Sequence, residues 1–213
     1  MLNRLLAALP APALFLGLVF FALSPAAEAS DARAAEAFVE REAQRVIDAL
    51  QAWREGEVDL DTLRRDFRDR VDDLADVERI TGFVLGRYRR GADPQALEEF
   101  SEVFREFAIQ VYERELGNYA GQTLSVTGSV TRNSGDYVVR SVVRGGNGEP
   151  DVPVNWRVLV RDNGMKVVDA EVMGVWLAQT QREQITGIIG NARGDISAAT
   201  RVLRERIERN NSR

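Results

Sequence analysis

The sequence contains no cysteine and no histidine among its 213 residues. Without cysteine the chain forms no disulfide, so packing alone has to hold the fold together. The absence of both residue types also excludes zinc sites built from them and the imidazole of Ser-His and Cys-His nucleophiles. We therefore expect no metal, no cofactor and no catalytic residue of these kinds.

Basic side chains are fewer than acidic ones, and the formal net charge is −5 at pH 7. A nucleic-acid-binding protein needs a net basic face, so this balance argues against one. Beyond the first thirty residues, no apolar run is long enough to cross a membrane.

The first thirty residues have the pattern of an export signal. Arg4 gives a basic start, Leu14–Leu23 is apolar throughout, and Ala27 and Ala29 are small residues of the kind that a signal peptidase recognises. The alternative is a retained membrane anchor, for which the apolar core is short. We expect residues 1–29 to be a cleaved signal peptide and residues 30–213 to form one domain.

The stretch Gly164–Gly190 joins the two kinds of secondary structure. Val168, Ala170 and Val172 alternate with Asp169 and Glu171, which predicts a strand with an apolar face and an acidic face. A glycine then ends the strand, and apolar residues recur with the spacing of a helix. A sheet that passes directly into a helix leaves room between two layers.

Helices are predicted before and after a set of strands. Their starts are expected at Asp31, at Asp59 or Asp61, at Asp76, at Asp93-Pro94 and at Asp195, where a carboxylate can cap a helix. In the third of them, which spans residues 76–90, Gly82 and Gly86 lie one turn apart. Glycine destabilises a helix by about 1 kcal/mol relative to alanine, so this pair suggests the close approach of another backbone or an opening.

Four strands are predicted between Gln122 and Val172, with short turns between them. The third has the clearest alternation, from Val152 to Val160, and Asp162-Asn163-Gly164 predicts a hairpin into the fourth. The sequence therefore predicts an α+β fold. Its antiparallel four-stranded meander is covered on one face by N-terminal and C-terminal helices and encloses an apolar cavity.

Three patches of sequence resemble the MlaC family, the toluene-tolerance-type phospholipid-binding proteins of the periplasm. They are LGRYRR with the following DPQALEEFSEVFREF, at 85–90 and 93–107, then YVVRSVV at 137–143, and KVVDAEVMGVWLAQTQREQ at 166–184. In order and spacing they span essentially the whole chain after the signal. Val168 stands where the family often has tyrosine, and Trp176 where many members have serine, which puts the size of the ligand in question.

The resemblance implies a lipid shuttle in the periplasm of a Gram-negative bacterium. Such a protein carries phospholipid between an outer-membrane lipoprotein–porin complex and an inner-membrane ABC transporter, with transient partners and itself as a monomer. The tails would lie between sheet and helices. The residues expected to line this pocket are apolar: Val84, Phe100, Phe104, Phe107, Val139, Val143, Val154, Trp156, Val158, Val168, Ala170, Val172 and Trp176.

Several alternatives remain open. The three phenylalanines can equally be ordinary core, and Arg140, Arg144 and Arg157 can approach a phosphate or simply point outward. The ligand can be another lipid, such as a hopanoid. The protein can also be a periplasmic adaptor with a filled core, or an enzyme on a cone-shaped sheet-and-helix fold that uses Asp169 and Glu171 as acid and base, provided that both face the cavity.

Overall fold

The computed structural model describes residues 25–145 and 150–212. The predicted signal peptide lies for the most part outside these residues. The helices of the described chain are α1 (Pro25–Arg54), α2 (Leu60–Leu74), α3 (Val77–Leu85), the short 3₁₀ helix η1 (Gly86–Arg89), α4 (Pro94–Leu116), α5 (Leu177–Asn191) and α6 (Ile196–Asn211). The strands are β1 (Thr123–Asn133), β2 (Asp136–Arg144), β3 (Val152–Arg161), β4 (Gly164–Val172) and β5 (Val175–Trp176).

The predicted α+β fold is confirmed, with two differences in its elements. The sheet has five strands rather than four, because the chain after Gly174 pairs with β4 over two residues before the helix begins. Helix α1 starts at Pro25 and not at Asp31, so the expected cleavage point after Ala29 lies within its first turns. The predicted start at Asp93-Pro94 is confirmed, since Asp93 accepts a hydrogen bond from the N–H of Ala96 at 3.0 Å.

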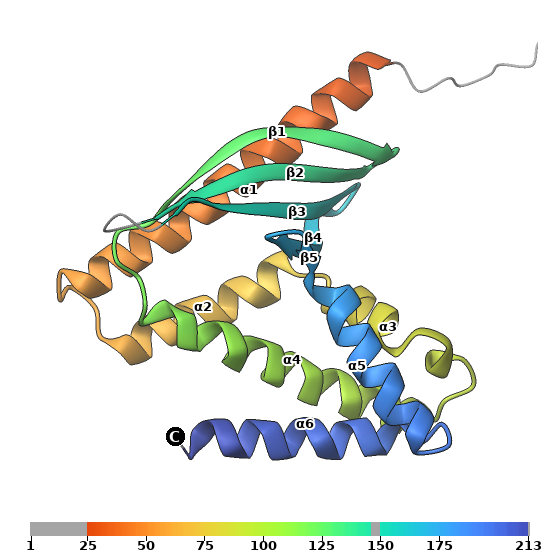
Figure 1. The fold of residues 1–213 in the computed structure, drawn as a ribbon. Helices are drawn as coiled ribbons and strands as arrows, with labels where there is room; N and C mark the ends of the chain where they lie inside the picture. The colour runs from red at the N-terminus through yellow and green to blue at the C-terminus, as the bar shows by residue number, and fades with distance from the viewer. Residues whose placement is uncertain (1–24, 146–149, 213) are drawn as a thin grey trace, which may run out of the picture.

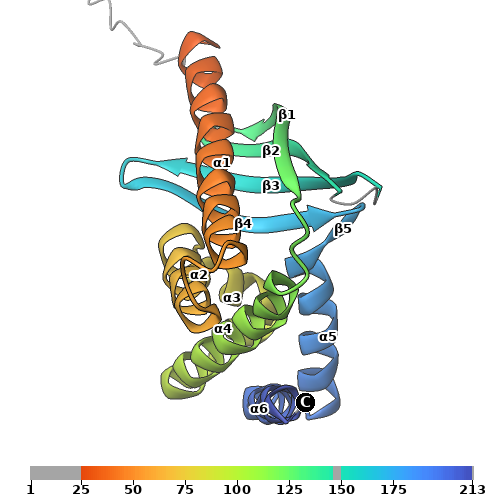
Figure 2. The ribbon, with the colours of Figure 1, turned by 90° about the vertical axis from the view of Figure 1, so that its left-hand side faces the viewer.

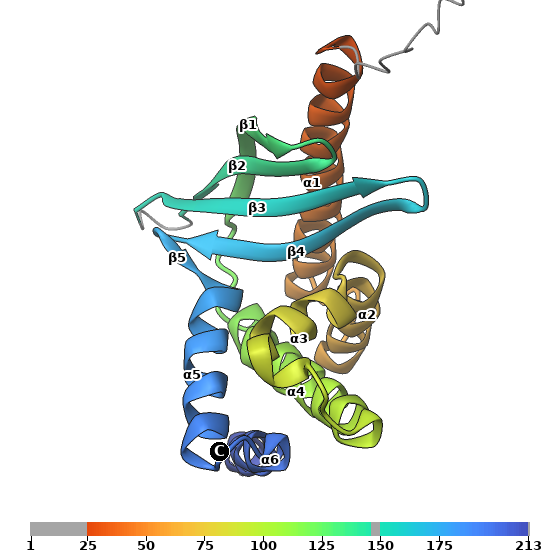
Figure 3. The ribbon, with the colours of Figure 1, turned by 90° about the vertical axis from the view of Figure 1, so that its right-hand side faces the viewer.

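The strands follow one another in the order β1-β2-β3-β4-β5, and all neighbours are antiparallel. Helix α1 lies across one face of this sheet (Figures 1 and 2). Figure 3 looks onto the opposite face, with α1 behind the strands. Helices α2, α3 and α5 contact β4, so the helical part of the protein gathers along that strand.

Apolar residues of α1 pack directly on the sheet. Ala35, Phe38 and Val39 share one side of the helix, as their spacing of three and four residues requires. They meet Tyr137 and Val139 of β2 and Val158 of β3 in one buried cluster. The apolar face of the strands and the apolar side of α1 therefore pack against each other at this contact.

A second core lies among the helices. Phe100, Phe104 and Phe107 of α4 pack there with residues of α3, α5 and α6, and the rings of Phe100 and Phe104 stack at 5.8 Å between centroids. A third cluster of Leu50, Leu63 and Leu116 joins α1, α2 and α4. Figure 1 shows the result as a sheet layer above and a helical layer below, connected through α1 and α2 on one side.

Gly82 in α3 and Gly86 at the start of η1 are approached by arginine side chains and not by a second backbone. A Cβ atom on Gly82 would lie 2.9 Å from a guanidinium nitrogen of Arg89, and one on Gly86 would lie 3.0 Å from Arg182. Gly86 also has a φ of +56°, which favours glycine. The expectation of close contact is met, but the neighbouring group differs from the one expected.

Two polar contacts connect α2 and α3 to β4. The N–H of Asp76 donates to the carbonyl of Val167 at 3.0 Å, and Lys166 donates through Nζ to the carbonyl of Asp73 at the end of α2. A cation at the C-terminal end of a helix is favourable because the exposed carbonyls carry partial negative charge. The edge strand is thus held to the helical layer by both backbone and side chain.

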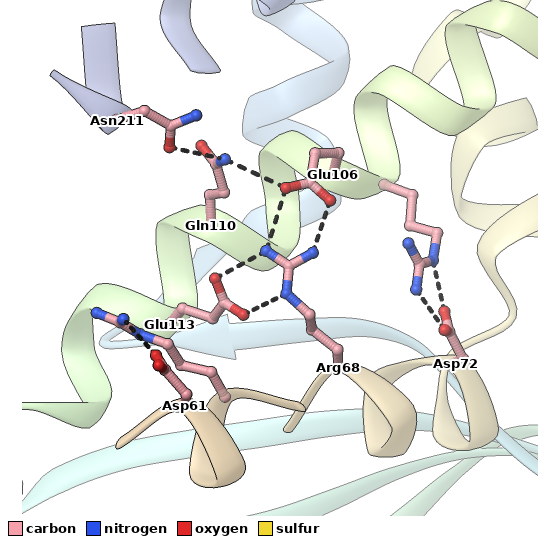
Figure 4. A network of polar contacts seen from close by, with 9 residues as sticks. Asp61, Arg68, Asp72, Glu106, Gln110, Glu113 and Asn211 are labelled. Atoms are coloured by element: carbon pink, nitrogen blue, oxygen red, sulfur yellow. Dashed lines mark hydrogen bonds and ion pairs between the residues drawn. The ribbon is translucent and has the colours of Figure 1, made fainter. Parts of the chain in front are cut away.

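Arg68 of α2 connects that helix to α4 by ion pairs (Figure 4). Its guanidinium binds Glu106 at 2.7 Å and Glu113 at 2.6 Å, while Arg105 of α4 pairs with Asp72 of α2. The hydrogen bond from Arg68 is the main cause that lowers the pKa of Glu106, against the opposing effect of its partial burial.

We predict that Arg68→Met lowers the free energy of unfolding by about 1–3 kcal/mol, since two carboxylates lose a charged donor. Because the pKa of Glu106 is depressed in the folded state, its contribution is present above the unfolded pKa and is lost as pH falls through the folded pKa. The difference between wild type and variant should therefore shrink on acidification below about pH 4. Urea unfolding at several pH values measures it. Arg64→Met is the matched control, because Arg64 is more exposed and lies 3.5 Å from Asp61.

We predict that Phe104→Ala destabilises the protein by about 3–5 kcal/mol, because it leaves a cavity in the packed helical core. The same change at Phe83, whose side chain is 37 % exposed, should cost much less. Urea denaturation of both variants gives the comparison, and similar losses would show that Phe104 is not part of a close-packed core.

Candidate functional site

The face of the sheet that α1 packs against holds most of the predicted strand residues. The register pairs Val139 with Trp156 across β2 and β3, and it pairs Val154 with Val172 and Trp156 with Ala170 across β3 and β4. Paired residues of antiparallel strands point to the same side, so this set shares one face.

Burial on this face falls from one end to the other. Val139 and Val158 are fully buried beneath α1, whereas Val143, Ala170 and Val172 are only partly buried. The less covered residues lie at the end of the sheet where β2 finishes, β3 begins and β4 passes into β5. This end, defined by Val143, Ala170 and Val172 and called the open end below, is where the apolar side chains of the face are only partly covered. Val154 lies beside them and is buried.

Tyr112 of α4 lies near Asp169 of β4. Its side chain is 41 % exposed, yet burial is the first cause that raises its pKa, followed by the negative charge of Asp169 on β4. Tyr112 is therefore a partly exposed residue of α4 on the side of Asp169, and not on the side of Ala170 and Val172. The sequence placed Tyr112 on the apolar side of its helix, but that pattern did not single it out as a site residue.

A polar residue of the same sheet face also escaped the sequence analysis. Ser141 of β2 is buried, donates through Oγ to the carbonyl of Val154 at 2.7 Å and accepts from Trp156 Nε1 at 3.0 Å. These bonds fix the indole of Trp156 across the face. The signal was present in the sequence, because Ser141 interrupts the apolar alternation between Val139 and Val143.

The predicted helical residues lie elsewhere. Val84, Phe100, Phe104 and Phe107 are buried together in the core of the helical layer with residues of α5 and α6. The structure therefore divides the predicted lining into a helical group, a group under α1 and a group at the open end. A common cavity lined by all three groups stays a prediction.

Two of the predicted residues depart from the expected face. A bulge in β4 leaves Val168 without a partner, so Val167 stands opposite Val158 in its place, and the alternation through Val168 is interrupted. Trp176 pairs with Glu171, which puts it on the other face from Val172, whereas Val175 pairs with Val172 and shares its face.

Asp169 and Glu171 lie opposite Arg157 and Asn155, on the face away from Ala170 and Val172. Both already have partners: Asn155 donates to Glu171 at 2.7 Å, and Asp169 accepts the N–H groups of Ala170 and Ala178, each at 2.9 Å. The second of these bonds caps the first turn of α5. These two carboxylates therefore do not form an acid–base pair directed into the apolar face.

The arginines considered for phosphate binding are also on that other face. Arg157 binds both oxygens of Asp136, at 3.0 and 2.7 Å, and Arg140 pairs with Asn155 in the register. Arg144 ends β2 on the same side by alternation and is exposed. These arginines therefore point outward, which was the alternative to phosphate binding.

Two open hollows lie in the helical layer, and neither includes a predicted site residue. One, of about 570 Å³, lies between α2, α4 and the end of α6 and includes Arg68 and Glu113. The other, of about 540 Å³, lies between η1 and the starts of α4 and α6. Within residues 25–145 and 150–212 no group of acidic side chains is placed to hold a metal ion. None of the helices in this part of the chain has the length and apolar character that crossing a membrane requires.

Asp169 offers a test of its capping role. Burial is the first cause that raises the folded-state pKa of Asp169, and the two backbone hydrogen bonds act against it. The ionised carboxylate therefore lowers the stability of the fold above that pKa, and this cost disappears as the pH falls and the group becomes protonated. We predict that Asp169→Ala destabilises the fold by about 1 kcal/mol through loss of the cap. Asp169→Asn keeps an acceptor and should match or exceed wild type at pH 7, with a difference that narrows on acidification. Thermal unfolding of both variants across pH measures this, and equal losses in the two would exclude a cap.

Known proteins resemble this chain both in sequence profile and in fold. The profile of the MlaC protein family matches residues 40–205. A solved structure of a phospholipid-binding protein from Ralstonia solanacearum, in complex with a phospholipid, is 28 % identical in sequence with a TM-score of 0.67. That similarity covers 80 % of this chain and 97 % of the other. No curated protein matches the chain. Since the family profile spans most of the sequence, the chain belongs to the MlaC family.

Proposed function

We propose that this protein binds phospholipid and carries it through the periplasm, with the acyl tails held between the sheet and the helices. The observation that carries the proposal is the solved relative, which contains a phospholipid and whose chain is matched over 97 % of its length. The open end of the sheet is the part of this chain that presents accessible apolar side chains next to the helical layer.

The physical requirement on such a carrier is severe. A buried methylene is worth about 0.8 kcal/mol, so exposing a tail of about fifteen methylenes to water costs about 12 kcal/mol. A carrier therefore has to surround almost the whole tail with apolar side chains. Val143, Ala170 and Val172 would supply one wall. We infer that the remaining predicted residues contact the tails only where the tails extend beneath α1 or between the helices.

The cellular role follows from the family and the predicted signal. We infer that residues 1–29 direct export and that residues 30–213 act in the periplasm as a monomer. The partners would be an outer-membrane lipoprotein–porin complex and an inner-membrane ABC transporter, each bound transiently. The two carboxylates considered for catalysis are engaged in capping and pairing, which favours a binding protein over an enzyme.

The direct experiment is to purify the protein, extract it with organic solvent and identify the lipid by mass spectrometry. Co-purified phospholipid at about one molecule per protein is expected. A hopanoid in its place would redirect the proposal to another lipid class. An empty extract, together with no uptake of labelled phospholipid, would leave an adaptor with a filled core as the better description.

A variant tests where the tails lie. We predict that Val172→Asp abolishes retention of phospholipid, because a carboxylate at the open end would have to be desolvated against the tails. Val130→Asp is the matched control, since Val130 is also a strand valine but is 48 % exposed and pairs with Val138 on the other face. Lipid per protein is measured after extraction, with melting temperature recorded in parallel. Retention by Val172→Asp would place the tails elsewhere.

A further inference from the structure

The turn between β4 and β5 has an unusual backbone for its sequence. Met173 has a φ of 51° and Gly174 a φ of 85°, while Val172 and Val175 on either side are paired. A two-residue hairpin with both central φ values positive is the type I′ turn, for which Asn-Gly is the favoured sequence. Methionine at the first position is unfavourable, because the left-handed region brings its Cβ close to the backbone.

The same turn exposes apolar side chains. Met173 is 67 % exposed and Val175 is 53 % exposed, which makes them the two most exposed large hydrophobic residues in the described chain. From Val172 to Gln181 the sequence carries no charged side chain, although 29 % of all residues are charged. When a residue has an unfavourable backbone conformation and its apolar side chain is exposed to water, that side chain is a candidate for contact with a partner.

The turn is continuous with the open end of the sheet. Val175 pairs with Val172 and so shares the face on which Ala170 and Val154 lie. The N–H of Met173 donates to the carbonyl of Pro153 at 3.1 Å, which fixes the turn to the start of β3. The apolar surface therefore continues from the proposed lipid site to the β4–β5 turn, and the paired residues that form it carry no charge.

We propose that the β4–β5 turn, Met173–Val175, touches the lipid bilayer when phospholipid enters or leaves the protein. This rests on the proposed function, in which the carried lipid leaves one membrane and enters another. A bilayer suits the turn because the contact is apolar and uncharged, while the chain as a whole is negative. Methionine is suited to an irregular apolar surface because its side chain is flexible and polarisable. Because no charge takes part, the contact should be insensitive to salt.

The test separates the apolar side chain from the fold of the turn. Met173→Asn creates the preferred Asn-Gly sequence, so the melting temperature should hold or rise. Val175→Thr removes apolar surface with little change in shape. Val130→Thr is its matched control on the opposite face of the sheet, at a similar exposure of 48 %. The purified proteins are compared for lipid retained after extraction, for co-flotation with phosphatidylcholine vesicles, and for transfer of fluorescent phosphatidylcholine between such vesicles.

We expect Met173→Asn to reduce co-flotation and the transfer rate by roughly tenfold, through loss of a buried apolar side chain, with retained lipid unchanged. Val175→Thr should act in the same direction, and Val130→Thr should behave as wild type. Wild-type rates and co-flotation in both turn variants would overturn the proposal and leave a protein surface as the partner of the turn. A wild-type protein that retains lipid but neither floats with vesicles nor transfers to them would overturn it as well. If wild type retains no lipid, the proposed function fails, and co-flotation still decides whether the turn touches a bilayer.

Discussion

The structure depends on how one helix covers an apolar sheet. An antiparallel sheet with one apolar face has to bury that face, and α1 packs across it through Ala35, Phe38 and Val39. The cover is partial, since burial is complete at Val139 and Val158 and incomplete at Val143 and Val172. The helical layer does not need the open end for its own stability, because it has a separate core around Phe100 and Phe104. The two cores therefore leave part of the apolar face of the sheet only partly covered.

The fold could largely be predicted from the sequence because its local patterns agree with its tertiary contacts. The alternation from Val152 to Val160 gives β3, the turn signal Asp162-Asn163-Gly164 gives the hairpin into β4, and Asp93-Pro94 starts α4. Each of these signals depends on neighbouring residues alone. The short β5 was missed because two residues carry no periodicity, and its pairing depends on the turn at Gly174.

The site was less predictable, because lining depends on which apolar stripe faces which neighbour. Phe104 and Val154 are equally apolar in sequence, yet the first packs among helices and the second lies on the sheet. Periodicity also fails at the bulge, where one unpaired residue moves Val168 out of step with Ala170. Gly82 and Gly86 showed that something packs closely there, but the sequence does not state that Arg89 and Arg182 are the neighbours.

The cap that Asp169 gives to α5 has a mechanical consequence. The first turn of the helix is hydrogen-bonded to the strand, while α2 and α3 are joined to the same strand at Lys166 and Val167. The sheet and the helical layer are therefore joined along β4, and separating them would break several hydrogen bonds at once. The spacing of the two layers along this strand is therefore a fixed property of the scaffold.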